Sequence, residues 1–320
     1  MACSPRRHGE AAMSTAVQHA PDFSPTASQL AIAYSVCRGI TRASAKNFYY
    51  AFLVLPKSKR RALCAVYAFM RRCDDIADDP GLSFEERRQK LVTWLDALHR
   101  VQTGHPTDDP ILLALTDAQR RFKIPPALLD QLAQGTAMDI VEEGYQAQGF
   151  QVQYRTFEDL RVYCYRVASV VGLVCIRVFG YQDSKAEKLA EQLGLAFQLT
   201  NIIRDVKEDL SMGRVYLPDE DLAKFDIQAT QLQNSFDPAR LRQVLAIEAD
   251  RARELYLSAD ALLPLIDEDS QPALWVLSTI YRRLLEKITR LQYDVFSQKV
   301  SLTTREKLTI LGKGFLKRLA

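Results

Sequence analysis

Apolar residues recur every three or four positions through most of the chain after residue 27, and this periodicity restricts the folds open to it. It is clearest in "PALLDQLAQGTAMDIVEEGY", "SKAEKLAEQLGLAFQLTNII" and "QPALWVLSTIYRRLLEKITRLQYDVF". No proline occurs between Pro126 and Pro218. Other prolines fall between the helical stretches, at Pro56, Pro80, Pro106, Pro110, Pro218 and Pro264. Because strand alternation and hairpin dipeptides are nearly absent, the sequence predicts an all-α fold.

The composition is that of a globular protein with a substantial apolar core. Of the 320 residues, 48% are hydrophobic and 25% are charged. Residues 1–26 are rich in Ala, Ser and Pro and lack periodicity, so we expect a disordered tail there and a single all-α domain over residues 27–320. Stretches such as "VASVVGLVCIRVFGY" are apolar on more than one face, which favours a central helix or the wall of an apolar cavity.

Charge and cysteine usage exclude several classes of protein. A net charge of +3 with no basic tract argues against nucleic-acid binding. The six cysteines form no C-x-x-C pair and the four histidines are scattered, so a zinc site is not expected. Most of the cysteines lie in apolar stretches, which fits a reducing compartment, and no apolar run reaches the ~18 residues of a membrane span. We therefore expect a cytoplasmic protein.

Two acidic pairs repeat a spacing that is unfavourable in a helix. "RRCDDIADD" carries Asp74 and Asp78, and "NIIRDVKEDL" carries Asp205 and Asp209. At i and i+4 the two carboxylates of a pair share one face, and their repulsion costs a few tenths of a kcal/mol. A single such pair is usually a solvated charged face. Two pairs flanked by the apolar stretches "AVYAFM" and "LGLAFQLTNII" indicate carboxylates that need cations.

Hard oxygen ligands with no His or Cys among them are typical of hard cations, which points to Mg²⁺ or Mn²⁺. Mg²⁺ is usually held by one or two carboxylates together with substrate phosphates. Two acidic stripes beside an apolar cavity therefore suggest a diphosphate on an apolar tail. Helical spacing adds Tyr67 and Arg71 to the first stripe, and Gln198 and Asn201 to the second.

Basic side chains near both motifs would suit such a diphosphate. They are Lys46, Arg71, Arg204 and Arg214. Arg makes bidentate contacts to phosphate, but each of these residues could instead form a salt bridge to a local acid, as Arg204 could with Glu208. Tyrosines occur in the same region, at Tyr163, Tyr165, Tyr216 and Tyr281. Aromatic residues in helices more often belong to the core than to a functional site.

The order, spacing and content of these motifs resemble the squalene/phytoene synthase family, whose members join two prenyl diphosphates head to head. The resemblance covers most of residues 40 to 300. It depends on "AKNFYYAFLVLP", "AVYAFMRRCDDIADD", "YCYRVASVVGL", "LAFQLTNIIRDVKEDLSMGRVYLP" and "IYRRLLEKI". It implies an isoprenoid-synthase-type helical bundle around a central apolar cavity.

The resemblance also implies roles for individual residues. The metal ligands would be Asp74, Asp78, Asp205 and Asp209. The substrate-binding residues would be Lys46, Asn47, Phe48, Phe52, Tyr67, Arg71, Gln198, Asn201 and Arg214. The catalytic residues would be Tyr163, Tyr216, Tyr281 and Arg204. The stretch "VFSQKVSL" departs from the family pattern, because similar proteins often carry an Arg near Gln298; Lys299 is the candidate substitute.

The implied reaction begins with loss of diphosphate from one substrate, aided by Mg²⁺, to give an allylic cation. The double bond of the second substrate attacks it, which yields a cyclopropyl-carbinyl diphosphate, and a dry cavity protects the cation from water. Phe48 and Phe52 share a helix face one turn beyond Lys46, where a ring at Phe52 would shorten the space for a tail. This favours two C15 substrates and a squalene-type C30 product, with NADPH needed only for squalene itself.

Several alternatives stay open. One is phytoene synthase, which makes a C40 product from two C20 substrates; another is a chain-elongating or cyclising terpene enzyme. A third is a catalytically silent helical assembly factor, although such a protein would be expected to lose some of the four aspartates. The C-terminal stretch "KLTILGKGFLKRLA" places basic residues among apolar ones, which predicts peripheral contact with an anionic membrane, the alternative being a helix packed on the domain.

Overall fold

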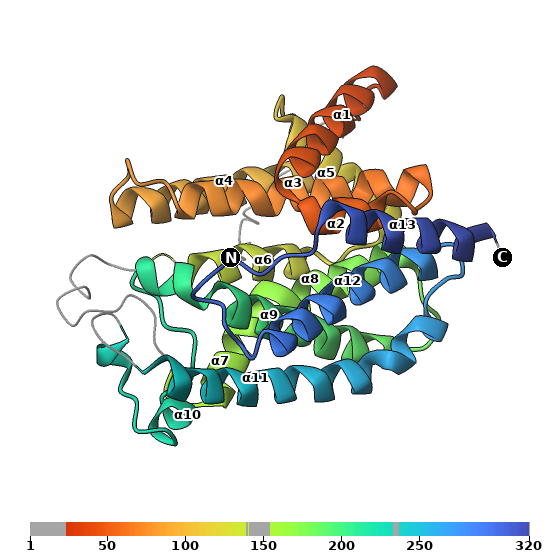
Figure 1. Ribbon diagram of the computed structural model, residues 1–320. Coiled ribbons are helices and arrows are strands. Elements are labelled where there is room, and N and C mark those ends of the chain that lie inside the picture. The colour runs from red at the N-terminus through yellow and green to blue at the C-terminus, as the bar shows by residue number, and fades with distance from the viewer. Residues whose placement is uncertain (1–23, 139, 141–153, 233–236, 320) are drawn as a thin grey trace, which may run out of the picture.

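The computed structural model describes residues 24–138, 140, 154–232 and 237–319 (Figure 1). It consists of helices, and within the described residues β pairing is limited to one bridge between Tyr181 and Ile266. The all-α prediction is therefore confirmed. The predicted disordered tail falls almost entirely on residues 1–23, which lie outside the described residues, so that part stays a prediction.

The helices follow one another along nearly the whole described chain. They are α1 (Ala27–Ser44), α2 (Lys46–Phe52), α3 (Lys57–Ala77), α4 (Phe84–Gln102), α5 (Pro110–Phe122), α6 (Pro126–Ala137), α7 (Phe157–Cys164), α8 (Val170–Phe179), α9 (Lys185–Ser211), α10 (Asp219–Ala223), α11 (Pro238–Ser258), α12 (Gln271–Arg290) and α13 (Thr304–Leu319). Three shorter turns join them: the π-helical η2 (Tyr165–Ser169) and the 3₁₀ segments η3 (Ala229–Gln231) and η4 (Ala259–Leu265).

Local sequence signals account for many of the helix boundaries. Capping boxes begin α1, α4 and α7 at Thr26, Ser83 and Thr156. In each, the hydroxyl of the capping residue accepts the backbone N–H of the third helical residue, and the side chain of that third residue accepts the backbone N–H of the capping residue. Pro110 and Pro264 were expected between helices, and that expectation was wrong. Pro110 is the first residue of α5, where a missing N–H costs nothing, and Pro264 lies inside the 3₁₀ segment η4.

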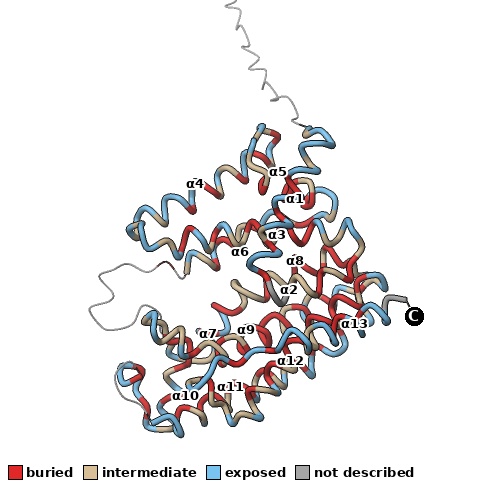
Figure 2. Tube along the Cα trace, turned by 45° about the horizontal axis from the view of Figure 1, so that its top comes forward, coloured by how far each residue is buried: buried red, intermediate tan, exposed pale blue. Residues whose placement is uncertain are grey.

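Helix α9 lies at the centre of the bundle and contacts α8, α11, α12 and α7. Buried residues follow it and its neighbours through the interior (Figure 2). Two glycines allow α8 and α9 to approach closely. A Cβ atom at Gly194 would lie 2.7 Å from the Ala168 carbonyl oxygen, and one at Gly172 would lie 2.8 Å from that of Ala190. The wall between these two helices is therefore tightly packed.

The continuous helical stretch Phe157–Phe179 is long and apolar enough to cross a membrane, with a mean hydropathy of 1.7. The sequence had suggested that no stretch would qualify. In the structure this stretch packs against α9 and α6 inside the bundle, so its apolarity is that of a core helix. Its middle turn, η2, widens to π-helical geometry, which often marks a functional site.

A cluster of buried charges ties three helices together. Arg251 of α11 bonds to both carboxylate oxygens of Asp221 in α10, at 2.5 and 3.2 Å, and to Glu248 at 2.7 Å. Its guanidinium also lies 4.1 Å from the centre of the Phe157 ring at the start of α7. Asp221 and Glu248 are fully buried. Burial raises the pKa of Glu248 to about 7, although Arg251 opposes this shift.

This raised pKa predicts a specific pH dependence of stability. The folded protein holds a proton on Glu248 up to about pH 7, whereas the unfolded chain releases it near pH 4.3, so stability falls as pH rises through this window. Glu248→Gln stays neutral and should remove this fall, a change on the order of 2 kcal/mol. Melting temperatures between pH 5 and 8 test this, with the exposed Glu254→Gln of the same helix as the control. An identical pH dependence in wild type and Glu248→Gln would contradict the prediction.

Candidate active site

The two acidic pairs lie at the ends of two helices that converge on one polar pocket. Asp74 and Asp78 lie in the last turn and at the C-terminal cap of α3, and Asp205 and Asp209 lie in the last two turns of α9. All four line a pocket of about 230 Å³. Neither α3 (Lys57–Ala77) nor α9 (Lys185–Ser211) has a basic residue in its last turn. The negative ends of two helix dipoles therefore add to four carboxylates.

Arginine side chains offset part of this negative charge. Arg204 makes a bidentate contact to Asp205, with its Nε 2.7 Å from Oδ1. Burial disfavours the charge on Arg204, but the bonds to Asp205 keep the pKa of Arg204 above its usual value. Arg214 lines the pocket and its Nη2 lies 3.4 Å from Asp78 Oδ1.

The polar pocket has the donor chemistry that a hard cation requires. Among the described residues, no three His, Cys, Asp or Glu side chains lie close enough to hold a metal by themselves. The Oδ1 atom of Asn201 is buried in the pocket wall and has no hydrogen-bond partner among the described residues. Its Nδ2 donates to Gln198 Oε1 at 3.4 Å. Carboxylates plus amide oxygens fit Mg²⁺ or Mn²⁺ whose coordination is completed by phosphate oxygens.

Three tyrosines stack beside the polar pocket. The rings of Tyr163 and Tyr216 are 5.1 Å apart, and Tyr154 lies 5.6 Å from Tyr163 and 6.3 Å from Tyr216. Tyr163 and Tyr216 are buried and line the pocket. Sequence reasoning missed Tyr154, since no motif surrounds it. It also missed Thr136 of α6, whose hydroxyl donates to Asp74 Oδ1 at 3.4 Å.

An apolar cavity of about 180 Å³ adjoins the polar pocket. Gln198 and Asn201 line both, so they mark the boundary between them. The walls of the cavity come from α2, α3, α8, α9 and α12, and they are lined by residues that include Phe48, Phe52, Tyr67, Met70, Val171 and Phe197. The predicted central apolar cavity is therefore confirmed, with an acidic pocket at one end.

Aromatic rings cover one wall of the cavity. Tyr281 stacks on Phe197 with ring centres 4.3 Å apart, and Phe48 lies 6.1 Å from Tyr281. Phe48 and Phe52 are 6.3 Å apart and both face the cavity, as their spacing predicted. Burial raises the pKa of the Tyr281 hydroxyl, although Arg204 opposes the shift. Tyr281 therefore stays neutral at physiological pH.

Other predicted site residues lie elsewhere or outside the described part. Lys46 and Asn47 begin α2, but their side chains lie outside the described residues. Arg71 bonds to Asp75 at 2.6 Å and is not among the described residues that line either pocket.

The local salt bridge foreseen for Arg204 forms with Asp205 instead of Glu208. Glu208 bonds to Lys299 at 2.9 Å. Lys299, the candidate substitute for the family's phosphate-binding Arg, is therefore paired with a carboxylate. The roles of all these residues as metal ligands, binding residues or catalysts stay predictions.

The helical bundle, the paired aspartates and the adjoining apolar cavity together match a known family. Residues 41–306 match the squalene/phytoene synthase family. The chain belongs to this family. Squalene/phytoene synthases are prenyltransferases that join prenyl diphosphates head to head and use divalent metal ions. This membership sets aside the assembly-factor and chain-elongating alternatives.

Similar proteins cover nearly the whole chain. The phytoene synthase of Mycobacterium tuberculosis is 38% identical over 282 residues, covering 87% of this chain and 89% of that protein. The 15-cis-phytoene synthase of Synechococcus elongatus is 35% identical over 302 residues, covering 90% and 94%.

Solved structures of the family are similar as well. A dehydrosqualene synthase superposes with a TM-score of 0.78 at 31% identity, covering 90% of this chain and 96% of that one. Squalene synthase HpnC from Alicyclobacillus acidocaldarius gives 0.73 at 27%, covering 84% and 97%.

Replacing any one of the four aspartates by Ala should reduce turnover by about 100-fold or more, since even the outer partners of metal ligands typically contribute 10–100-fold. The melting temperature should stay unchanged or rise slightly where repulsion at a helix C-terminus is relieved. Asp205→Ala is the exception: it should lower the melting temperature, because it leaves Arg204 without its bidentate partner. Asp75→Ala is the matched control. Asp75 adjoins Asp74 in sequence, is exposed, and bonds to Arg71 away from the pocket. Near-normal turnover in two or more of the four variants would contradict the metal assignment.

Proposed function

We propose that the protein joins two C20 prenyl diphosphates head to head to form a C40 product, as a phytoene synthase. The observation that carries the head-to-head chemistry is the pair of acidic helix ends that face one polar pocket beside a dry apolar cavity. Two observations favour C20 over the C15 substrates that the sequence favoured. They are the names of the similar proteins, phytoene synthases from bacteria and from Zea mays, and the length of the cavity.

The residues that line the cavity extend over a greater length than a C15 tail. On α9 they run from Asn201 to Ala190, eleven residue steps that span about 16 Å along the helix axis. Three backbone bonds span at most 3.3–3.6 Å, so an isoprene unit with four chain bonds spans about 4.5 Å. Three units reach about 14 Å and four about 18 Å at full extension. A slightly bent C20 tail would fill the cavity, whereas a C15 tail would leave its far end without contacts.

The side chains would act as follows. Asp74, Asp78, Asp205 and Asp209 would hold the metal ions, which when bound would draw electron density from the diphosphate and ease its departure. Arg214, beside Asp78, would bind a phosphate oxygen.

The cavity would hold a prenyl tail in a fixed orientation without water, which protects the allylic cation. The faces of Phe48, Phe197 and Tyr281 would stabilise that cation. The buried Tyr163 and Tyr216 would shield the polar pocket.

The second candidate is a C30 product from two C15 substrates. Two solved relatives are called dehydrosqualene synthase and squalene synthase, and Phe52 faces the cavity as the C30 argument requires. However, Phe52 lies only one helical turn further into the cavity than Phe48. The residues that line the cavity on α12 run from Tyr281 back to Leu274, about 10 Å along the helix axis, and so extend further than Phe52. Phe52 therefore lies along the side of the cavity, and we propose that it does not limit the tail.

Product analysis of the wild type and Phe52→Ala separates the two candidates. With Mg²⁺ and no NADPH, the wild type should convert C20 diphosphate to a C40 hydrocarbon faster than it uses C15 diphosphate. Phe52→Ala should lose stability by about 3–5 kcal/mol but keep its C20-to-C15 preference within about twofold. A wild type that prefers C15, together with a variant that shifts towards C20, would support the C30 product and overturn the C40 proposal.

We also propose that the enzyme is cytoplasmic and that α13 places it on an anionic membrane, which would receive the hydrocarbon product. Helix α13 packs on α12 and α2 through Ile310 and Leu311, so the packed-helix alternative holds for one face. The other face exposes Leu308, Phe315 and Leu316, by 52%, 39% and 68%. Exposed Lys313 and Lys317 lie among them. Such a basic apolar face suits an anionic lipid surface.

Replacing Leu308, Phe315 and Leu316 together by Ser should reduce co-sedimentation with anionic vesicles by about tenfold or more, since it removes the apolar contacts and keeps the buried face. Truncation of α13 would be less informative, because it would also remove the buried Ile310 and Leu311. The control is Leu257→Ser, which changes an apolar residue of α11 that is 68% exposed. Equal vesicle binding by the triple variant and the control would rule out this surface.

A further inference from the structure

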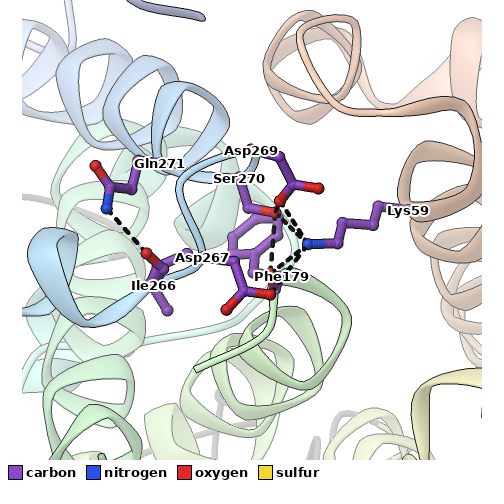
Figure 3. A network of polar contacts seen from close by, with 7 residues as sticks. All are labelled: Lys59, Phe179, Ile266, Asp267, Asp269, Ser270 and Gln271. Atoms are coloured by element: carbon purple, nitrogen blue, oxygen red, sulfur yellow. Dashed lines mark hydrogen bonds and ion pairs between the residues drawn. The ribbon is translucent and has the colours of Figure 1, made fainter. Parts of the chain in front are cut away.

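Figure 3 shows a polar network around Lys59. It adjoins residues that line the end of the cavity opposite the acidic pocket. Lys59, in the first turn of α3, reaches across to the end of α8 and the start of α12. Its Nζ donates to the Phe179 carbonyl oxygen at 2.7 Å, to Asp269 Oδ1 at 2.5 Å and to Ser270 Oγ at 3.0 Å. Asp267 Oδ2 lies 3.5 Å away. The Lys59 side chain is only 13% exposed.

Each of the three helices that this network connects, α3, α8 and α12, carries a residue that lines the end of the cavity. Phe179, whose carbonyl oxygen accepts the bond, lines it with its own ring. Leu63 lies one turn after Lys59 on α3, and Leu274 lies one turn after Ser270 on α12, where its N–H donates to the Ser270 carbonyl at 3.2 Å. Lys59 therefore connects the three segments that carry these cavity-lining residues.

The segment that ends α8 and the segment that precedes α12 are bonded to each other independently of Lys59. The N–H of Asp267 donates to the Gly180 carbonyl at 3.0 Å, and Ser270 Oγ donates to the Phe179 carbonyl at 3.0 Å. Gly180 has φ 81°, and a Cβ there would lie 1.9 Å from Asp267 Oδ2, so this close approach requires glycine. Lys59 adds the polar connection from α3 to this rigid unit.

Burying most of an ammonium group to connect helices carries a large desolvation penalty. Its desolvation is offset only when several acceptors surround it, and apolar residues of similar volume often stabilise a fold equally well. What a charged, directional contact adds is a fixed geometry. We propose that Lys59 is a positioning residue that sets the depth of the cavity and so the longest prenyl tail that the enzyme accepts. This inference rests on the proposed function, because it requires the cavity to hold the tail.

The test compares tail lengths in wild type and Lys59→Met, which keeps the length of the side chain and removes its donors. The measured quantity is kcat/KM with C15, C20 and C25 prenyl diphosphates, in Mg²⁺. When α3 is released from the end of α8, the C25-to-C20 ratio should rise by about tenfold, mainly through a lower KM for C25. A ratio that stays within twofold of the wild type, with only a lower melting temperature, would overturn the proposal and leave Lys59 a structural residue.

Two further variants guard against a folding defect. Asp269→Asn keeps a hydrogen-bonding side chain but removes one charge from the network, and it should shift the ratio in the same direction by about threefold. If Lys59→Met does not fold, an unchanged ratio in Asp269→Asn overturns the proposal by itself. Lys57→Met is the matched control, because Lys57 is exposed in the same turn of α3 and should leave the ratio unchanged.

The proposed function has a separate readout. Thermal stabilisation by non-reactive thio-analogues of the three diphosphates reports tail binding without any product. If the wild type forms no head-to-head product, the proposed function fails. If stabilisation by the C25 analogue nevertheless increases in Lys59→Met but not in Lys57→Met, the role of Lys59 in setting cavity depth stands.

Discussion

Electrostatic repulsion between the ends of α3 and α9 is the constraint on which the rest of the site depends. Four carboxylates and two negative helix ends meet at one pocket, where Arg204 contacts Asp205 and Arg214 contacts Asp78. Such a pocket gains most from a ligand that brings cations with it. A diphosphate that carries divalent metal ions meets that need, which explains why acidic pairs can persist beside an apolar cavity.

The sequence predicted the parts of the structure that depend on spacing along a single helix. The i, i+4 spacing of the aspartates predicted the acidic faces that line the polar pocket, and the same spacing of Phe48 and Phe52 predicted that both rings face the cavity. It could not show which neighbour a long side chain chooses, so the contact between Arg71 and Asp75 stayed one of two alternatives. Tyr154 and Lys59 could not be found either. Tyr154 contacts Tyr216 and Lys59 contacts Phe179, and these partners are far away in the sequence and meet them only in the folded bundle.

The same reasoning explains why motifs identify the family more readily than the product. The motifs surround the polar pocket, where the diphosphate chemistry of C30 and C40 synthases would be the same. We propose that tail length is decided at the other end of the cavity, which Phe179 and Leu274 line. The residues there are ordinary apolar side chains, and their effect depends on how three helices are spaced. A pattern of residue types carries little information about that spacing.

Helices α3 and α9 each extend from the acidic pocket to the far end of the cavity. Close packing of α8 on α9 through Gly172 and Gly194 makes this wall stiff. A substitution at the far end can therefore alter tail length without moving the carboxylates, more than ten residues away on the same helix. The acidic pocket and the far end of the cavity can therefore change nearly independently during evolution. After gene duplication, one copy could acquire a new chain length through a few neutral-looking core substitutions while its ionisation chemistry stayed intact.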